Sequence, residues 1–161
     1  MSKKLIYLFL LSLGFVGCAT VPKADLKTAQ QIASLKQPQE GQAGIYVYRN
    51  HSIKGNTLKK DIWIDGQCLG QTAAGIYFYK EVEGGKNHII STESEFSPNH
   101  LTLATESGKQ YFIQQKIKMG AFVGGAKLEQ TDEVKARADI RKIDLGTTGQ
   151  CSKQSIELPS H

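Results

Sequence analysis

A cysteine, Cys68, stands two residues after an Asp65-Gly66 pair in the stretch IWIDGQCLG. A cysteine in such a position can act as a nucleophile, as a metal ligand or as half of a disulfide. A nucleophilic cysteine needs a solvent-accessible thiolate in an electropositive setting. The residues around Cys68 are Asp65, Gln67 and Leu69, and none of them carries a positive charge. The local sequence therefore favours a disulfide over a reactive thiol.

Two carboxylates, Glu93 and Glu95, alternate along an expected strand and would lie on one face of it. A pair of carboxylates can act as acid and base in sugar hydrolysis when the two groups are held at the right separation. The sequence indicates no cleft around this pair, so we interpret both residues as part of a solvent-exposed sheet face. The alternative is an enzyme, either a hydrolase using Glu93 and Glu95 or a thiol enzyme using Cys68.

Metal and nucleotide sites lack their usual signatures. Zinc sites commonly draw on His or Cys residues at short fixed spacings, and no such spacing occurs here. His88 and His100 would face one another across neighbouring strands, which we interpret as a solvated pair. No phosphate-binding loop or esterase nucleophile motif is present. We therefore expect no metal, no cofactor and no catalytic residue.

Aromatic side chains are concentrated in the expected strands, and four tyrosines form two i, i+2 pairs. These residues are Tyr46, Tyr48, Tyr77 and Tyr79. Partly exposed, they would form a binding face for a protein partner or a glycan. The alternative, which we favour, is that the C-terminal helix or the N-terminal segment covers them.

The N-terminus carries the features of an export signal. Lys3 and Lys4 precede an apolar run over residues 5–15, which is shorter than the roughly 20 residues that span a bilayer. The following FVGCA resembles the lipobox of bacterial lipoproteins, with Phe15 where leucine is usual. That resemblance implies that residues 1–17 are a signal peptide and that Cys18 is lipidated. Several acyl chains would then hold the protein firmly on a membrane.

The expected location follows from the same resemblance. Ala19, rather than aspartate, after Cys18 favours the outer membrane, with the domain facing the periplasm. In such an oxidising compartment the remaining pair, Cys68 and Cys151, is expected to form a disulfide. Two unpaired thiols are the alternative, because a sequence does not show whether two cysteines come within bridging distance.

Composition sets further limits. Without residues 1–17, 144 residues remain, enough for one ordinary domain with a real core. The net charge of +5 includes Lys3 and Lys4, so the remaining chain carries about +3. This mild excess, with no dense basic run, argues against nucleic acid as a partner.

The chain then divides into a tether, a β domain and a tail. Residues 18–43 are rich in Ala, Gln and Lys. Leu26, Ala29 and Ala33 would line one side of a short helix, but the segment has too little apolar surface to fold alone. We interpret it as a flexible tether spanning roughly 25–30 Å. Residues 44–145 form the β domain, and residues 146–161 form a polar, irregular tail.

Apolar residues alternate with period two through the β domain, and turn residues recur every 8–12 positions. This pattern predicts about seven short strands in an antiparallel sandwich or a small barrel. Asp65-Gly66 is a strong hairpin signal. The stretch TDEVKARADIRKI has an acidic start and a basic end, which predicts one short helix after the strands.

Three segments together carry a family resemblance: GQAGIYVYRN, then IWIDGQCLGQT with GIYFYKEVEGGKNHIISTES, then GKQYFIQQKIKMG. In order and spacing they resemble the small bacterial lipoproteins and periplasmic proteins grouped as domain of unknown function 2846, over residues 41–133. The segment IDGQCLG with VEGGKNHI is also similar to the PEGA-type module, an immunoglobulin-like sandwich. The resemblance implies an envelope location and a β-rich fold, and it brings no catalytic residues. We therefore predict a membrane-anchored, non-catalytic module that binds or scaffolds an envelope protein or glycan.

Overall fold

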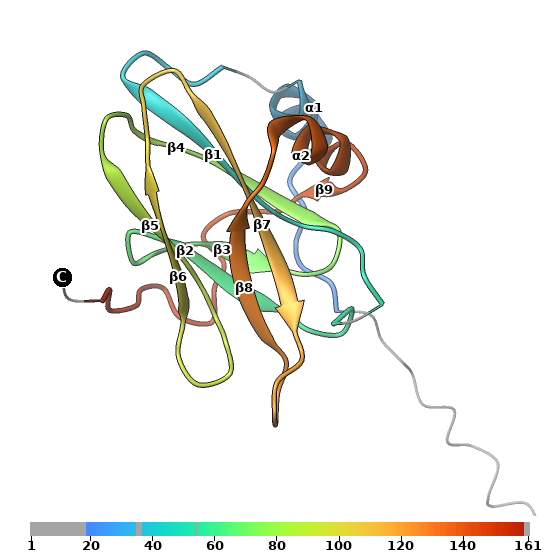
Figure 1. Cartoon of the computed structure of the whole chain (residues 1–161). Helices are drawn as coiled ribbons and strands as arrows, with labels where there is room; N and C mark the ends of the chain where they lie inside the picture. The colour runs from blue at the N-terminus through green and yellow to red at the C-terminus, as the bar shows by residue number, and fades with distance from the viewer. Residues whose placement is uncertain (1–18, 35–36, 54, 160–161) are drawn as a thin grey trace, which may run out of the picture.

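The computed structural model describes residues 19–34, 37–53 and 55–159. The expected signal peptide and Cys18 lie outside the described residues. Within this part the chain forms two helices and nine strands (Figure 1). They are α1 Leu26–Ala33, β1 Gln42–Arg49, β2 Lys60–Ile64, β3 Gln67–Thr72, β4 Ile76–Glu83, β5 Asn87–Thr92, β6 Asn99–Ala104, β7 Gln110–Lys118, β8 Gly125–Gln130, α2 Glu133–Ile140 and β9 Asp144–Leu145.

The strands form two sheets that face one another as a sandwich. The first sheet has the order β8-β7-β1-β4-β9 and the second has the order β3-β2-β5-β6. The prediction of a mainly β sandwich with a short C-terminal helix is thus confirmed. Strands β1 to β8 correspond to expected strands, while the two-residue β9 was not anticipated.

Strand pairing is mixed rather than purely antiparallel. β1, at the centre of the first sheet, is antiparallel to β4 but parallel to β7, and β4 is parallel to the short β9. The expectation of an antiparallel sandwich was wrong in this respect. The period-two pattern places side chains on faces but does not specify the direction in which two strands pair.

The alternation of β1 separates two apolar clusters. Ile45 and Val47 point between the sheets into the main core, while Tyr46 and Tyr48 point to the opposite face of the first sheet. The main core also contains Ala43, Ile62, Ile64, Leu69, Ala73, Ile76, Phe78, Val82, Ile90, Leu103, Ile113 and Leu128. The outer cluster also contains Tyr77, Phe112, Ala136, Ile140 and Leu145.

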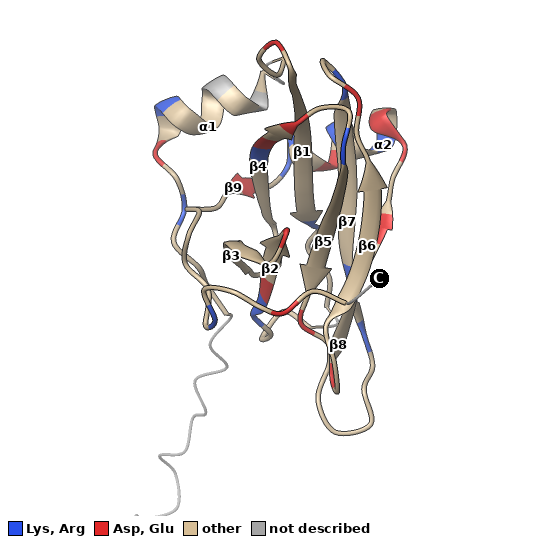
Figure 2. Ribbon diagram, turned by 90° about the vertical axis from the view of Figure 1, so that its left-hand side faces the viewer, with Lys and Arg blue, Asp and Glu red and all other residues tan. Residues whose placement is uncertain are grey.

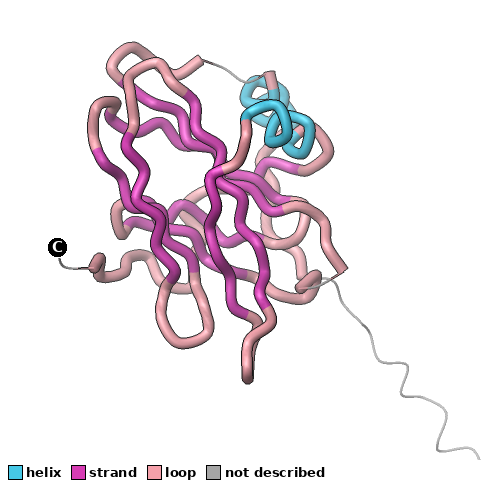
Figure 3. The backbone as a smooth tube through the Cα atoms, in the orientation of Figure 1, coloured by secondary structure: helices cyan, strands magenta, loops and turns pink. Residues whose placement is uncertain are grey.

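Both helices lie on the same side of the strands (Figure 3). The view of Figure 2 separates them, with α1 beside β4 and β9 and α2 beside β7. Each helix packs two of its apolar side chains against the outer cluster, Ala136 and Ile140 from α2 and Ala29 and Ile32 from α1. The domain therefore has three layers: the second sheet, the first sheet and a layer of two short helices.

The segment expected to be a flexible tether is docked on the domain from Ala19 to Ser34. Its backbone pairs with the segment that follows α2: the Ala24 N–H donates to the Leu145 carbonyl over 2.8 Å. In return, the Thr147 N–H donates to the Pro22 carbonyl over 3.0 Å. These bonds continue the edge of the first sheet beyond β9.

Helix α1 begins at a capping residue, Asp25, whose carboxylate accepts the Thr28 N–H at 3.0 Å. Its buried side differs from the one expected, because Leu26 is 80% exposed while Ala29 and Ile32 pack on the outer cluster. A short amphipathic helix of this kind gains most of its stability from such packing. The tether prediction considered the segment in isolation and missed the apolar surface on which it folds.

Candidate functional site

The cysteine pair lies on the second sheet and its covering tail. Cys68, on the edge strand β3, is bonded to Cys151 in the segment after β9, with Cα atoms 6.0 Å apart. The expected disulfide is present, so Cys68 does not carry the free thiol that a thiol enzyme would need. The bond joins residues that are 83 positions apart in the chain.

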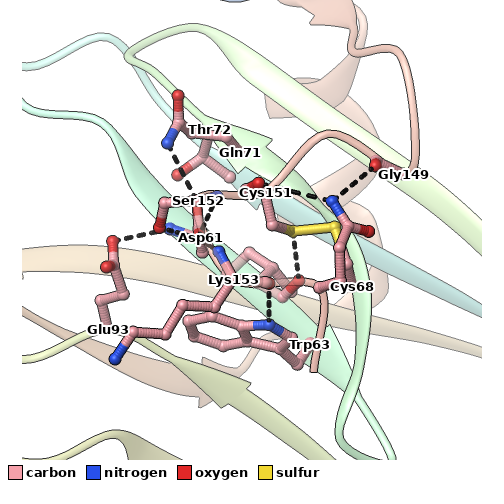
Figure 4. The surroundings of a disulfide bond; sticks show 12 residues. Asp61, Trp63, Cys68, Gln71, Thr72, Glu93, Gly149, Cys151, Ser152 and Lys153 are labelled. Carbon is pink, nitrogen blue, oxygen red and sulfur yellow. Dashed lines mark hydrogen bonds between the residues drawn. A yellow bond between two sulfur atoms is a disulfide. The ribbon is translucent and has the colours of Figure 1, made fainter. Parts of the chain in front are cut away.

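A buried carboxylate, Asp61 on β2, holds the same tail one residue further on (Figure 4). Its Oδ2 accepts the Ser152 N–H at 2.7 Å and the Ser152 hydroxyl at 2.5 Å, and the Lys153 N–H lies at 3.3 Å. Its Oδ1 accepts the Gln71 amide at 2.9 Å from the neighbouring strand. Several donors thus compensate the burial of this charge.

Trp63 completes this attachment. Asp61 and Trp63 are two residues apart on β2 and therefore share a face of the sheet. The Trp63 indole N–H donates to the Lys153 carbonyl over 2.9 Å (Figure 4). Backbone bonds continue the contact, since the Cys68 N–H donates to the Gln154 carbonyl and the Ile156 N–H donates to the Gly66 carbonyl, each over 2.9 Å. The tail is irregular, as expected, but it is docked against this face.

Sequence reasoning missed Asp61 and the docking of the tail. A signal was available: an acidic residue directly before the alternating apolar run of β2, on the same face as the single tryptophan of the chain. A charge in such a position needs a partner, because burial of an unpaired carboxylate is costly. The partner lies 91 residues later, and no local pattern indicates it.

The carboxylates of the enzyme alternative are bound to backbone amides. Both residues follow β5 instead of lying on a strand, contrary to the expectation. Glu93 Oε2 accepts the Asp61 N–H at 3.0 Å. Glu95 accepts the N–H groups of Ala121, Phe122 and Val123 at 2.5–3.3 Å, and these bonds, above all the one from Phe122, lower the pKa of the Glu95 carboxyl. Both side chains are placed to fix loops.

The two histidines do not face one another. His100 lies opposite Ser91 in the β5–β6 pairing, and His88 lies opposite Leu103. His88 is 7% exposed, with Nδ1 at 2.6 Å from Asp65 Oδ2 and Nε2 at 2.9 Å from the Glu83 carbonyl. Burial by itself lowers the pKa of His88, but the hydrogen bonds to Asp65 and Glu83 outweigh it, so the pKa is raised.

Three of the four tyrosines of the expected binding face are buried in this arrangement. Tyr46 and Tyr48 are fully buried and Tyr77 is 2% exposed, while Tyr79 is partly buried. The Tyr46 ring lies 4.6 Å from Tyr79 and stacks on Phe112 at 5.0 Å between ring centroids. Burial raises the pKa of Tyr46, Tyr77 and Tyr79. The covering elements are α1, α2 and the chain after α2.

A hollow of about 470 Å³ lies beside the disulfide. Ile64, Leu69 and Val82 give it an apolar floor, and Asp65 and Lys80 place one charge of each sign at its edge. Tyr79 is the one member of the expected tyrosine face that reaches it. Its size and mixed lining suit a small ligand or a partner's side chain.

Within the described residues, no group of three or more His, Cys, Asp or Glu side chains is placed to hold a metal ion. Neither of the helices in this part of the chain has the length and the apolar character needed to cross a bilayer. Together, fold and contacts define a disulfide-bonded β-sandwich protein whose described cysteines, buried acid and buried histidine all serve internal contacts.

Comparison with known proteins identifies the family to which this protein belongs. Residues 39–126 match the family described as "Protein of unknown function (DUF2846)", and the chain belongs to this family. A protein of Haemophilus influenzae, described as an uncharacterized protein, is 44% identical over 132 residues. These residues make up 82% of this chain and 77% of that relative. The match to the family includes Cys68 and ends within β8, so Cys151 lies beyond it.

Proposed function

We propose that this protein is a lipid-anchored protein of the cell envelope whose β sandwich acts as a non-catalytic binding or scaffolding module. The observation that carries the proposal is the disulfide between Cys68 and Cys151. Disulfides form and persist in oxidising compartments outside the cytosol. An exported chain is also what the N-terminal sequence predicts, and Cys18 follows that signal as the lipid-carrying residue.

A non-catalytic role is supported by the contacts of the side chains that an enzyme would use. Cys68 is in a disulfide, and the oxygens of Glu93 and Glu95 accept backbone N–H groups. His88 is bonded through both ring nitrogens. A general acid, base or nucleophile must be able to reach a substrate, and these groups are engaged elsewhere.

The anchor is tested by intact mass spectrometry of the full chain extracted from membranes of the expressing bacterium. We expect a polypeptide that begins at Cys18 and carries the added mass of acyl chains. The Cys18→Ala variant should lack that mass. Wild-type protein without acyl mass would refute the lipid anchor.

The binding role is tested by cross-linking in intact cells, with photoreactive side chains placed at exposed positions around the hollow beside the disulfide. Gln67 is a suitable position because it is exposed and lines that hollow. We expect a discrete adduct with an envelope protein or glycan. Uniform absence of adducts at these positions would count against a module that binds through this surface.

A further inference from the structure

Several large apolar side chains are exposed in three loops at one end of the sandwich. They come from the β1–β2 loop, the β5–β6 loop and the β7–β8 hairpin, which is the lowest part of the coloured ribbon in Figure 1. Their exposed fractions are 96% for Ile53, 82% for Phe96, 82% for Met119, 86% for Phe122 and 55% for Val123. A group of exposed apolar residues on a small domain marks an interaction surface.

Contacts tie these three loops to one another. The Glu95 carboxylate, next to Phe96, accepts the N–H groups of Ala121, Phe122 and Val123, which ties the β5–β6 loop to the tip of the hairpin. The β1–β2 loop meets the other side of the hairpin. A side chain at Gly124 would come within 2.4 Å of Leu58, so glycine permits this close approach. A hollow of about 360 Å³ lies between these two loops.

The first described residue lies against one of these loops, the β1–β2 loop. The Ala19 N–H donates to the Asn56 carbonyl over 3.3 Å, and Asn56 is flanked by Gly55 and Thr57, which line the hollow beside Phe122 and Val123. Residues 21–24 are then fixed to the chain around β9. A lipid on Cys18 would therefore be attached next to a residue that contacts the β1–β2 loop.

We propose that the five apolar residues Ile53, Phe96, Met119, Phe122 and Val123, here named the loop edge, insert into the surface of the phospholipid bilayer to which the lipid anchors the chain. This inference rests on the proposed lipid anchor and adds an orientation: the loop edge faces the membrane, and α2 and the opposite end of the sandwich face away. Apolar and aromatic side chains lying at the boundary of headgroups and acyl chains strengthen the attachment given by a lipid.

The charges near the loop edge suit this partner. The tip of the hairpin carries neither sign and is tan in Figure 2. Lys59 and Lys118 are exposed at the bases of the loops, where a lysine can approach lipid phosphates. The acid closest to the tip, Glu95, directs its oxygens at backbone amides. A protein partner would also use exposed apolar residues, but the position of Ala19 beside the β1–β2 loop favours the bilayer.

Depth-dependent quenching of tryptophan tests the orientation. The acylated full chain is reconstituted into phosphatidylethanolamine and phosphatidylglycerol vesicles, with or without brominated acyl chains. Phe122→Trp places a probe on the loop edge. Val134→Trp is the matched control, because Val134 is 78% exposed on α2, at the other end of the view in Figure 1. The single native tryptophan, Trp63, is 1% exposed and gives the same background in both variants.

We expect brominated vesicles to quench the emission of the Phe122→Trp variant at least two-fold more than that of the Val134→Trp variant. We also expect the emission of the Phe122→Trp variant to be shifted to the blue. Equal quenching of the two variants would overturn the proposal. A photoreactive residue at Phe122 that forms an adduct with an envelope protein, without lipid quenching, would also overturn it in favour of a protein partner.

The same samples separate this inference from the proposed function. Mass spectrometry and flotation with the vesicles report whether the chain is acylated and bound. An acylated, floating protein whose Phe122→Trp emission is not quenched refutes the loop edge alone. A protein without acyl mass refutes the anchor on which both depend.

Discussion

His88 is buried with both ring nitrogens bonded, so its protonation is coupled to the folded structure. Its partner Asp65 has two roles. Asp65 Oδ2 bonds the ring, while Asp65 Oδ1 accepts the Ile89 N–H at 2.9 Å. Asp65 also has a positive φ of 51°, followed by Gly66 at 77°, in the turn between β2 and β3. The turn and the histidine are therefore coupled through one side chain.

The pKa of His88 is raised in the folded state above its ordinary value near 6.5. The charged ring thus stabilises the fold. This contribution is fully present below about pH 6.5 and is lost as pH rises through the raised pKa. We expect the free energy of unfolding of the wild type to fall across that window relative to that of the His88→Gln variant. Urea denaturation at a series of pH values measures the difference.

Asp65→Asn is the matched control for this effect. Asparagine tolerates a positive φ and keeps an oxygen for the Ile89 N–H, so the turn should persist while the charge beside His88 is removed. NMR titration of His88 in this variant should show a lower pKa than in the wild type. An unchanged pKa would mean that Asp65 does not hold the proton on His88.

The roles of some individual residues could be predicted from the sequence, and the roles of others could not. Asp65-Gly66 was identified as a turn because two adjacent residues that tolerate positive φ are a local signal. The pairing of Cys68 with Cys151 was expected because few cysteines were available. Asp61, which binds Ser152 and Lys153, was missed, because its partners are distant in sequence and polar residues in a tail carry no distinctive pattern.

Helix α1 is held on the domain by a small apolar contact. It is eight residues long and contacts the domain through Ala29 and Ile32. Beneath it lies the outer cluster, in which the buried Tyr46 hydroxyl has no hydrogen-bond partner among the described residues. A buried hydroxyl without a partner is unfavourable relative to a hydrated one. The apolar attachment of α1 is small, and we expect this helix to undock at lower cost than the sandwich unfolds.

Ile32→Asp should release α1 while the sandwich stays folded. Replacement of a partly buried isoleucine by a charge removes apolar burial, so we expect a loss of about 1–2 kcal/mol in the stability of the docked helix. Hydrogen exchange should accelerate at the amides of α1 but not at those of β1. Leu26→Ser, at a position 80% exposed in the same helix, is the control and should leave exchange unchanged. Equal acceleration in both variants would contradict the docking through Ile32.

Element prediction from sequence succeeded where the pattern is local. The strands β1 to β8 and the helix α2 follow from alternation, turn residues and an acidic helix start. The parallel pairing of β1 with β7 and the docking of α1 could not be predicted, because both depend on surfaces created by other parts of the chain. The end of β5 at Thr92 could not be predicted for the same reason. Because the strand ends there, Glu93 and Glu95 do not lie on one strand face as expected.

For the molecule as a whole, the disulfide connects the second sheet to the tail after α2 and β9. In the chain-entropy model a bond between residues 83 positions apart stabilises the fold by about 4–5 kcal/mol, by restricting the unfolded chain.

We expect Cys151→Ser to lower the free energy of unfolding by about this amount in urea and to leave Cys68 open to alkylation. The Cys68→Ser/Cys151→Ser double variant should be equally destabilised and should not be alkylated at either position. Unchanged stability in both variants would show that Asp61, Trp63 and the backbone bonds hold the tail without the disulfide.

The central position of β1 has a consequence for the order in which the protein assembles. Both neighbours of this strand, β4 and β7, are made after it, and the parallel partner β7 extends to Lys118. Long-range pairings of this kind are slow to form, because the intervening chain must close a large loop first. We expect β1 to lack its parallel neighbour until Gln110–Lys118 has been synthesised. Until then the first sheet is incomplete, which favours the unfolded chain, the form in which the proposed export through a membrane would take place.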